Sequence, residues 1–372
     1  MIPDSRPHVP SDPPGVGLIG AGAIARSAHL PAYARWGIPV VAIASRTPSS
    51  ARALAGQFGI ATVHDRVEDL LADPAVAVVD IATGPHGRVD LIAAAVAAGK
   101  HVLAQKPLVL ETHEADRLAE VLALAAARGI RVAGNMNARW APPWRVATLL
   151  ARAGEIGEVV GVTHLHDKPL PPLAGTPFDD VPHMLVNDYL AHWIDISRCW
   201  LEGSRVVSVA AHDSRVPGQP ADAANPWQAS IHIAVSSGAT AAIRVVGDVR
   251  TGSGGCPFWI HGTAGTIRGS VLRGSDGVEI ERGSDSVEIE RDGERVRVDA
   301  EGEWFPDGFA GAMGELLTAV AEDREPENSA AHVLVSARLG MAAAASAANG
   351  GTPERPAGLE LTRSAGRDGR GR

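Results

Sequence analysis

Three side chains in separate stretches of the sequence could together hold a small substrate and exchange a proton with it. Lys106 is followed by proline, which restricts the lysine to an extended backbone and fixes the point from which its amine projects. Asp188 and His192 are four residues apart, so on a helix they would present a carboxylate and an imidazole on one face. Histidine is the natural proton acceptor near neutral pH. The three side chains therefore predict an acid–base site.

A glycine-rich segment near the N-terminus has the spacing of a dinucleotide-binding turn. In Val16-Gly-Leu-Ile-Gly20-Ala-Gly22-Ala-Ile-Ala25, an apolar strand ends at the first glycine of the turn and a helix begins at once. Backbone N–H groups at the start of that helix would bind a pyrophosphate, whereas the alternative is a glycine-rich turn without function. We expect the following residues to bind a nicotinamide cofactor: Gly20, Gly22, Ala23, Ile24, Ser45, Arg46, Thr83, Gln105, Lys106 and Asn135.

The end of the second predicted strand bears on which dinucleotide is preferred. An acidic residue at this place binds the 2′-hydroxyl of NAD, but this chain has Ser45-Arg46-Thr47 there. Arg46 could stack on the adenine or pair with a phosphate. The sequence therefore favours NADP(H) over NAD(H), and the alternative is a solvated arginine on an enzyme that uses either cofactor.

The elements that must position these groups follow two patterns. Up to residue 133, short apolar strands alternate with Ala/Leu-rich helices, which is typical of a parallel sheet covered by helices. After about Asn137, strand-like runs follow one another with few helices between them, as in an antiparallel sheet. We predict a disordered tail over 1–14, an α/β Rossmann domain over 15–137, an α+β domain with a large, mostly antiparallel open-faced sheet over 138–362, and a flexible tail over 363–372.

Individual elements can be placed from the same patterns. The strands expected in the first domain are Val16–Ile19, Val40–Ala44, Val76–Ile81, His101–Leu103 and Arg131–Ala133, with helices around 23–36, 49–58, 88–98 and 113–128. In the second domain we expect a helix near 143–153, a long strand over Val159–His166 and two late helices, around 308–321 and 330–347, that cover a sheet face or the domain junction. A nearly exact repeat, Gly274–Arg282 and Gly283–Arg291, predicts an exposed hairpin.

Composition excludes several classes of partner. With 34 Lys+Arg against 43 Asp+Glu, the net charge of −9 argues against binding nucleic acid or an anionic membrane surface. The first 14 residues lack an apolar signal-peptide core, and we find no stretch with the roughly 18 uncharged apolar residues of a membrane span. Cys199 and Cys256 are too few for a disulfide framework. We expect a cytoplasmic protein that acts on a small molecule.

The sequence resembles the Gfo/Idh/MocA family, the glucose–fructose oxidoreductase and inositol dehydrogenase group, over nearly its whole length. Four motifs carry the resemblance, in the family's order: Gly20–Ala25, the run from Ala98-Gly-Lys-His-Val to Lys106-Pro107, Asn137-x-Arg139-Trp140, and Asp188-x-x-x-His192-x-x-Asp195. The resemblance implies reversible oxidation of a sugar or cyclitol hydroxyl by hydride transfer. By the same resemblance His192 is the acid/base, Lys106 polarises and orients the oxygen, and Asp188 orients the substrate.

The resemblance also suggests other groups at the substrate site and an oligomer. We expect Arg139, Trp140, His164 and His166 to contact substrate, because the strand that carries the two histidines is similar to one that borders the family's active site. The alternatives for the histidines are paired structural groups or, with His183, a metal site; we predict no metal. The family resemblance further implies a homodimer or homotetramer formed through the C-terminal sheet, and a Lys106–Pro107 bond that is often cis.

Two positions depart from the family's pattern. Gln105 stands where Glu-Lys-Pro is usual, and Arg88 stands where a histidine usually follows Thr83-Gly-Pro. An NAD-dependent glycosidase of the same fold is the nearest alternative among enzymes. The alternative from another class is a cofactor-binding regulator without turnover, for which Gln105 is the only hint.

Overall fold

A six-stranded parallel sheet forms the first part of the chain in the computed structural model, which describes residues 4–171, 173–176, 178–247, 255–271, 286–291 and 293–361. Its strand order is β3-β2-β1-β4-β5-β6, and every pairing is parallel. This is the Rossmann order, in which the order of the strands reverses between β1 and β4 and leaves a crevice at the carboxyl edge. The strands are β1 (Val16–Ile19), β2 (Val40–Ala44), β3 (Thr62–His64), β4 (Val78–Ile81), β5 (His101–Gln105) and β6 (Val132–Asn135).

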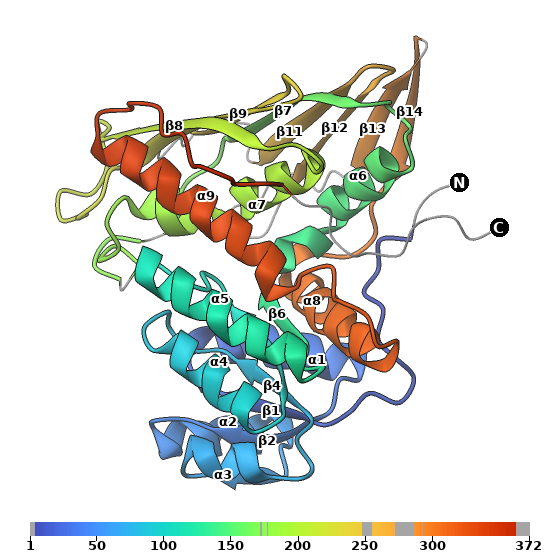
Figure 1. Ribbon diagram of the computed structural model, residues 1–372, viewed down its shortest axis with the longest axis vertical. Helices are drawn as coiled ribbons and strands as arrows, with labels where there is room; N and C mark the ends of the chain where they lie inside the picture. The colour runs from blue at the N-terminus through green and yellow to red at the C-terminus, as the bar shows by residue number, and fades with distance from the viewer. Residues whose placement is uncertain are drawn as a thin grey trace.

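Helices cover both faces of this sheet (Figure 1). They are a π-helical turn, η1 (Ala25–His29), that continues as α1 (Leu30–Trp36), then α2 (Pro48–Phe58), α3 (Val67–Ala72), α4 (Arg88–Ala97) and α5 (Thr112–Ala127). The predicted strands and helices are confirmed, with ends shifted by up to two residues. Two elements were not predicted, β3 and α3, because three and six residues are too few to show a period.

An eight-stranded sheet forms most of the second part, in the order β14-β13-β12-β11-β7-β10-β9-β8. Only the β7–β10 pairing is parallel among the described strands, so the predicted mostly antiparallel sheet is confirmed. The strands are β7 (Val159–His166), β8 (Val206–Ser214), β9 (Gln228–Val235), β10 (Thr240–Val245), β11 (Cys256–Gly262), β12 (Thr266–Val271), β13 (Ser286–Arg291) and β14 (Glu294–Asp299). Figure 1 shows α6 (Pro142–Arg152) and α7 (Ala191–Trp200) on one side of this sheet.

Two late helices join the sheets, as predicted. Side chains of α8 (Trp304–Ala321), including Phe309 and Met313, are buried against Val16 and Leu103 of the Rossmann sheet. The first turn of α9 (Ala330–Ala348) packs on the Rossmann core, and its later turns pack under the eight-stranded sheet. In the described part of the chain, α9 is also the one helix that is long and apolar enough to cross a membrane, and 56% of its most apolar window is buried within the protein.

The sequence repeat is only partly described. Its first copy, residues 274–282, lies outside the described residues. The end of the second copy forms β13, which pairs antiparallel with β14 in a hairpin, from Ser286 opposite Asp299 to Arg291 opposite Glu294. The described hairpin therefore joins the second copy to the segment that follows it.

Candidate active site

The catalytic lysine predicted from the sequence lies at the carboxyl edge of the Rossmann sheet. Lys106 follows the last residue of β5, and the Lys106–Pro107 peptide bond is cis. Its ammonium donates to the Asp188 carboxylate, with Nζ 2.9 Å from Oδ1, and to the Asp188 backbone carbonyl at 3.2 Å. Asp188 is 3% exposed, so this ion pair is shielded from water. The structure thus brings together two of the three residues that the sequence placed in separate stretches.

Asp188 and His192 lie on two consecutive helical pieces rather than on one α-helix. Asp188 belongs to a π-helical turn, η3 (Leu185–Tyr189), and His192 to the first turn of α7. Leu190 between them has φ −80° and ψ 5°, outside the helical region. The short turn aims the Asp188 carboxylate at Lys106, while α7 carries the imidazole into the junction between the two domains.

His192 is a buried imidazole beside the lysine. Burial, and next the positive charge of Lys106, lower the pKa of His192 to about 3. The ring therefore stays neutral at physiological pH, when one of its nitrogens can accept a proton. Trp304 packs edge-on against it, with ring centroids 5.4 Å apart. Nδ1 of His192 has no hydrogen-bond partner within the described part of the protein.

The two histidines of β7 lie in an aromatic core under α7. His164 stacks on Trp200 at 5.3 Å between ring centroids, neither of its ring nitrogens is hydrogen-bonded in the described structure, and burial lowers its pKa to about 3. His166 Nε2 lies 2.8 Å from the Tyr189 hydroxyl. His183 instead pairs with Asp213, 2.8 Å away. Each of the three has its own protein surroundings, and the described residues hold no metal-ligating group that includes any of them.

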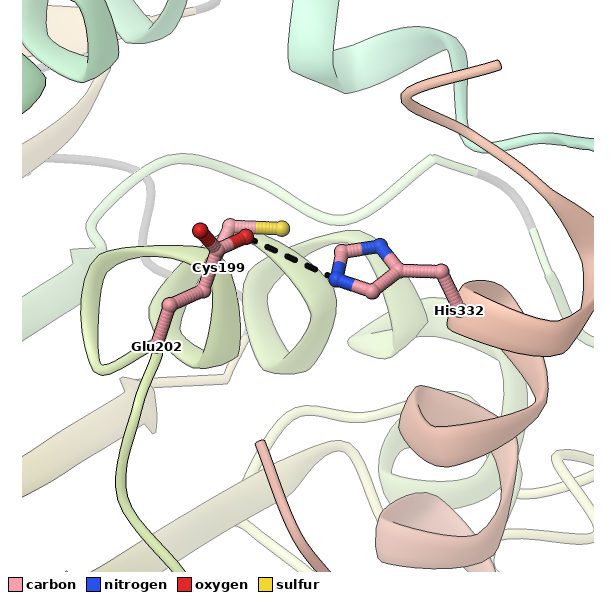
Figure 2. A group of neighbouring side chains, drawn as sticks. All are labelled: Cys199, Glu202 and His332. Atoms are coloured by element: carbon pink, nitrogen blue, oxygen red, sulfur yellow. Dashed lines mark ion pairs between the residues drawn. The ribbon is translucent and has the colours of Figure 1, made fainter. Parts of the chain in front are cut away.

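One other group of side chains has metal-ligating chemistry: Cys199, Glu202 and His332, whose ligand atoms lie within 4.8 Å of one another (Figure 2). Burial raises the pKa of the Cys199 thiol to about 12, whereas a metal needs the thiolate. The guanidinium of Arg198 contacts both ring nitrogens of His332 at 3.0 Å. Because this positive charge would repel a cation, we interpret the group as part of an ion-pair network.

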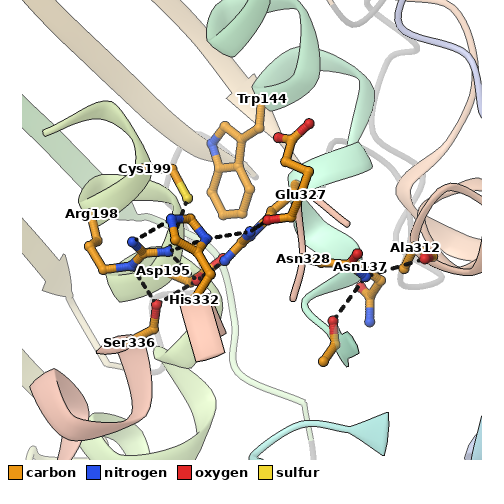
Figure 3. Close-up of polar contacts among 12 residues, drawn as sticks. Asn137, Trp144, Asp195, Arg198, Cys199, Ala312, Glu327, Asn328, His332 and Ser336 are labelled. Atoms are coloured by element: carbon orange, nitrogen blue, oxygen red, sulfur yellow. Dashed lines mark hydrogen bonds and ion pairs between the residues drawn. The ribbon is translucent and has the colours of Figure 1, made fainter. Parts of the chain in front are cut away.

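Arg139, predicted to contact substrate, belongs to the same network. Its guanidinium makes a two-pronged ion pair with Asp195, both N–O distances being 2.7 Å, and donates to the Glu327 carbonyl at 2.6 Å. Ser336 on α9 and Arg198 also contact Asp195, and the dashed lines of Figure 3 follow this network between α7 and α9. At 2% exposure, Arg139 links η2 (Asn137–Trp140) to α7 and to the segment before α9 from within.

Trp140 is enclosed in the same junction. It is 4% exposed, and a Cβ added to Gly311 of α8 would come within 2.3 Å of its ring, so the two elements touch. The guanidinium of Arg145 lies over the Trp140 ring, 5.6 Å from the ring centroid. Protein groups surround Arg139 and Trp140, so both serve the packing of this region, and their contact with substrate stays a prediction.

The predicted cofactor turn has the shape that a dinucleotide requires. Gly20 has φ +112°, and a Cβ there would lie 2.8 Å from the Ala82 carbonyl oxygen, so only glycine fits. A Cβ at Gly22 would meet nothing within 4 Å, which leaves room at the start of the helix for a phosphate. Ala25 is fully buried against β1. These observations fit a bound NAD or NADP.

The other predicted cofactor residues border the same edge. Arg46 is exposed after β2, and the Ser45 hydroxyl accepts from the Thr47 amide at 3.4 Å. Gln105 ends β5 beside Asn135 of β6, and its Oε1 is a buried acceptor without a partner among the described residues. An unpaired buried acceptor at this edge suits a ligand that donates a hydrogen bond, as a carboxamide does.

Arg88 is a structural link that the sequence analysis noted without giving it a role. Its buried guanidinium donates to the carbonyls of Pro107 and Thr83, so it ties the loop after β4 to the turn that carries Lys106. Burial lowers the pKa of Arg88 to about 10, and the nearby Asp188 carboxylate partly offsets this. In the sequence, Arg88 is conspicuous only because it stands where the family usually has a histidine. No local sequence pattern predicted that Trp304 packs against His192, because the two residues lie 112 positions apart.

Comparison with known proteins agrees with this geometry. Residues 15–133 match the model for the "oxidoreductase family, NAD-binding Rossmann fold", and residues 144–268 match the "GFO/IDH/MocA C-terminal domain". Over 156 residues the chain is 33% identical to 1,5-anhydro-D-fructose reductase from Ensifer adhaerens, covering 42% of this chain and 46% of that protein. It is 27% identical over 288 residues to levoglucosan dehydrogenase from Pseudarthrobacter phenanthrenivorans, covering 68% and 72%. Matches to several curated relatives span less than half of their length.

The fold as a whole is shared with solved structures. An oxidoreductase from Agrobacterium radiobacter, crystallised with NAD+, L-tartaric acid and magnesium, superposes with a TM-score of 0.77 at 22% identity and covers 92% of this chain and 98% of that one. Both sheets, the glycine turn and both matched domains thus lead to one assignment. The chain belongs to the Gfo/Idh/MocA oxidoreductases.

Proposed function

We propose that this protein interconverts a hydroxyl and a carbonyl on a sugar, cyclitol or related small polyol, with NADP(H) preferred over NAD(H). The observation that carries the proposal is the cluster of Lys106, Asp188 and a neutral His192 at the carboxyl edge of a sheet whose glycine turn fits a dinucleotide. This edge is where doubly wound folds bind their ligands.

Each side chain has a definite task in that reaction. When bound, the nicotinamide accepts or supplies the hydride. An ammonium has three N–H donors, and two of those of Lys106 go to Asp188, so the third can hold the substrate oxygen. In the oxidation, the hydroxyl proton passes to the neutral imidazole of His192, and in the reduction His192 returns it to the carbonyl oxygen. Asp188 fixes the direction of the ammonium.

The preference for NADP rests on Arg46. This arginine is exposed directly after β2, where a carboxylate would otherwise exclude the 2′-phosphate. A guanidinium can bind a phosphate through two parallel hydrogen bonds.

The substrate class rests on the relatives. The two curated relatives described above are named for a 1,5-anhydrosugar and for levoglucosan, and both names denote sugar rings. His164 and His166 are both buried in the described structure, where His166 packs on Tyr189 and Trp193 and His164 on Trp200. Both histidines would therefore shape the substrate site through these aromatic rings rather than touch the solvent-facing substrate.

We also propose that the protein forms a homodimer or homotetramer through its eight-stranded sheet. Alternate residues of β9 and β10, such as His232 and Arg244, face away from the core and are exposed. Light scattering coupled to gel filtration would test this, and a monomer at micromolar concentration would exclude it.

The deciding experiment is a screen of sugars, cyclitols and keto-sugars with all four nicotinamide dinucleotides, followed at the absorbance band of the reduced ring. Turnover of any compound supports the proposal, and a higher kcat/KM with the phosphorylated cofactor supports the preference. Sugar release from a glycoside with no net change in absorbance would point to a glycosidase instead. Binding of cofactor without any turnover would contradict the proposal.

A further inference from the structure

One large apolar side chain beside Lys106 stays open to solvent. Phe178 is 50% exposed, and its ring centroid lies 5.9 Å from the Lys106 ammonium. The chain has only 15 Phe, Trp and Tyr residues, and most of those near His192 are buried. Phe178 therefore offers an exposed apolar face next to an ammonium, a carboxylate and an imidazole.

Hydrogen bonds anchor Asp179, the residue directly after Phe178. The carboxylate of its neighbour Asp179 accepts hydrogen bonds from the amides of Ala224, at 2.8 Å, and Asn225, at 3.1 Å. The Asn225 side chain in turn donates to the Asp179 carbonyl at 2.6 Å. Asp179 is 3% exposed although it lies in a loop. The chain is thus anchored directly after Phe178, whose ring lies beside Lys106.

We propose that Phe178 is a wall of the substrate site that packs against the C–H face of a ring-shaped polyol and makes the enzyme prefer rings to open chains. The inference rests on the proposed function and narrows its substrate class. A pyranose or cyclitol has hydroxyls at its rim and C–H groups on its faces, so it can offer an oxygen to Lys106 while a face lies on the phenyl ring. A flexible open-chain polyol has no such face and must also be ordered on binding.

The expected effect is selective. Phe178→Ala should raise KM for ring polyols about five- to tenfold while kcat changes little, because the lost contact stabilises ground state and transition state alike. KM for open-chain polyols should change less than about twofold. Phe178→Tyr keeps the ring and should behave as wild type. Leu124→Ala removes an equally exposed apolar side chain, 46% exposed, from α5 and should change neither.

Two readouts separate this inference from the proposed function. The first is kcat and KM for myo-inositol, D-xylose and 1,5-anhydro-D-glucitol against xylitol and sorbitol. The second is saturation-transfer NMR of the same compounds with NADP+ bound, which reports the contact of ring C–H protons with the protein whether or not the compound turns over. Loss of C–H saturation in Phe178→Ala, but not in Leu124→Ala, supports the inference even if no turnover is found.

Three results would overturn it. Equal losses for rings and open chains in Phe178→Ala would mean that Phe178 acts through Lys106 or the loop. If Phe178→Ala leaves both KM and the C–H saturation of ring compounds unchanged, Phe178 lies outside the site. In that case turnover by the wild type would still support the proposed function. Absence of binding by every ring compound to the cofactor-loaded wild type would exclude a ring-polyol site.

Discussion

Lys106 and Asp188, 82 positions apart in the sequence, meet through a 2.9 Å ion pair between an amine on the first sheet and a carboxylate on the second domain. This ion pair connects the Rossmann domain, whose glycine turn fits the cofactor, with the second domain, which carries His192. Chemistry on a bound substrate therefore depends on how the two domains are held together.

Removing the charge of Asp188 should disable catalysis without unfolding the protein. In Asp188→Asn the ammonium loses its anionic partner but keeps the backbone carbonyl, so its direction becomes less well fixed. We expect kcat/KM to fall about 10- to 100-fold, with a change in melting temperature of only a few degrees. Asp180→Asn, in the exposed loop before η3, is the matched control and should keep full activity. An Asp188→Asn enzyme with wild-type kcat/KM would contradict this role.

Reversing the charge at Arg46 should reverse the cofactor preference. Arg46→Glu places a carboxylate where it accepts the ribose hydroxyl and repels a 2′-phosphate. The ratio of kcat/KM for NADP+ to that for NAD+ should fall at least about tenfold. Arg52→Glu, which changes an exposed arginine of α2, should leave the ratio unaltered. If both variants behave alike, Arg46 does not contact the cofactor.

His164 should make the fold sensitive to acid. The pKa of His164 is about 3 in the folded protein and near 6.5 in the unfolded chain. As the pH falls below about 6.5, the unfolded chain therefore binds a proton at His164 that the folded protein does not bind. Near pH 5 this costs about 2 kcal/mol of stability, and the loss deepens as the pH falls toward 3. His164→Phe keeps a ring on Trp200 and should remove that share of the pH dependence in urea unfolding. His113→Gln, on an exposed histidine of α5, should leave the pH dependence as in the wild type. An unaltered pH dependence in His164→Phe would show that His164 is not held neutral.

Arg88 should support both stability and turnover. Arg88→Met keeps the apolar stem but leaves the buried carbonyls of Pro107 and Thr83 without their donor. We expect a loss of about 2–4 kcal/mol in the free energy of unfolding and a kcat lowered about tenfold. Arg88→Lys should restore part of kcat, because its amine can reach one carbonyl. Arg117→Met, on an exposed arginine of α5, is the control. A stable Arg88→Met with normal kcat would refute the link.

The sequence predicted the parts of the fold that a local pattern controls. Val16–Ile19 before Gly20, and Val159–His166, show their strands through apolar runs or alternation, and the structure has both with the predicted bounds. The six-residue helix α3 shows no period of its own and is stabilised by the buried Leu70 and Leu71. Its formation depends on packing that no local pattern records.

In the candidate site, too, local patterns predict some residues, whereas the place of others depends on partners far away in the sequence. Lys106 could be placed at the sheet edge because it follows a strand and precedes a proline, and the structure has it there. The burial of Arg139 could not be predicted, because its partners Asp195 and Glu327 come from 56 and 188 positions away. Phe178 lies in a loop without any period, and only the structure shows that its ring lies beside Lys106.

Deuterium transfer tests the central claim most directly. A keto-sugar or keto-cyclitol is incubated with NADPH that carries deuterium on the transferred face of C4, and the product is analysed by mass spectrometry. We predict one deuterium on the reduced carbon with the wild type, and a rate at least about 100-fold lower in Lys106→Ala and in His192→Asn, with cofactor affinity unchanged in His192→Asn. Product without deuterium, or transfer at the wild-type rate in both variants, would contradict the account.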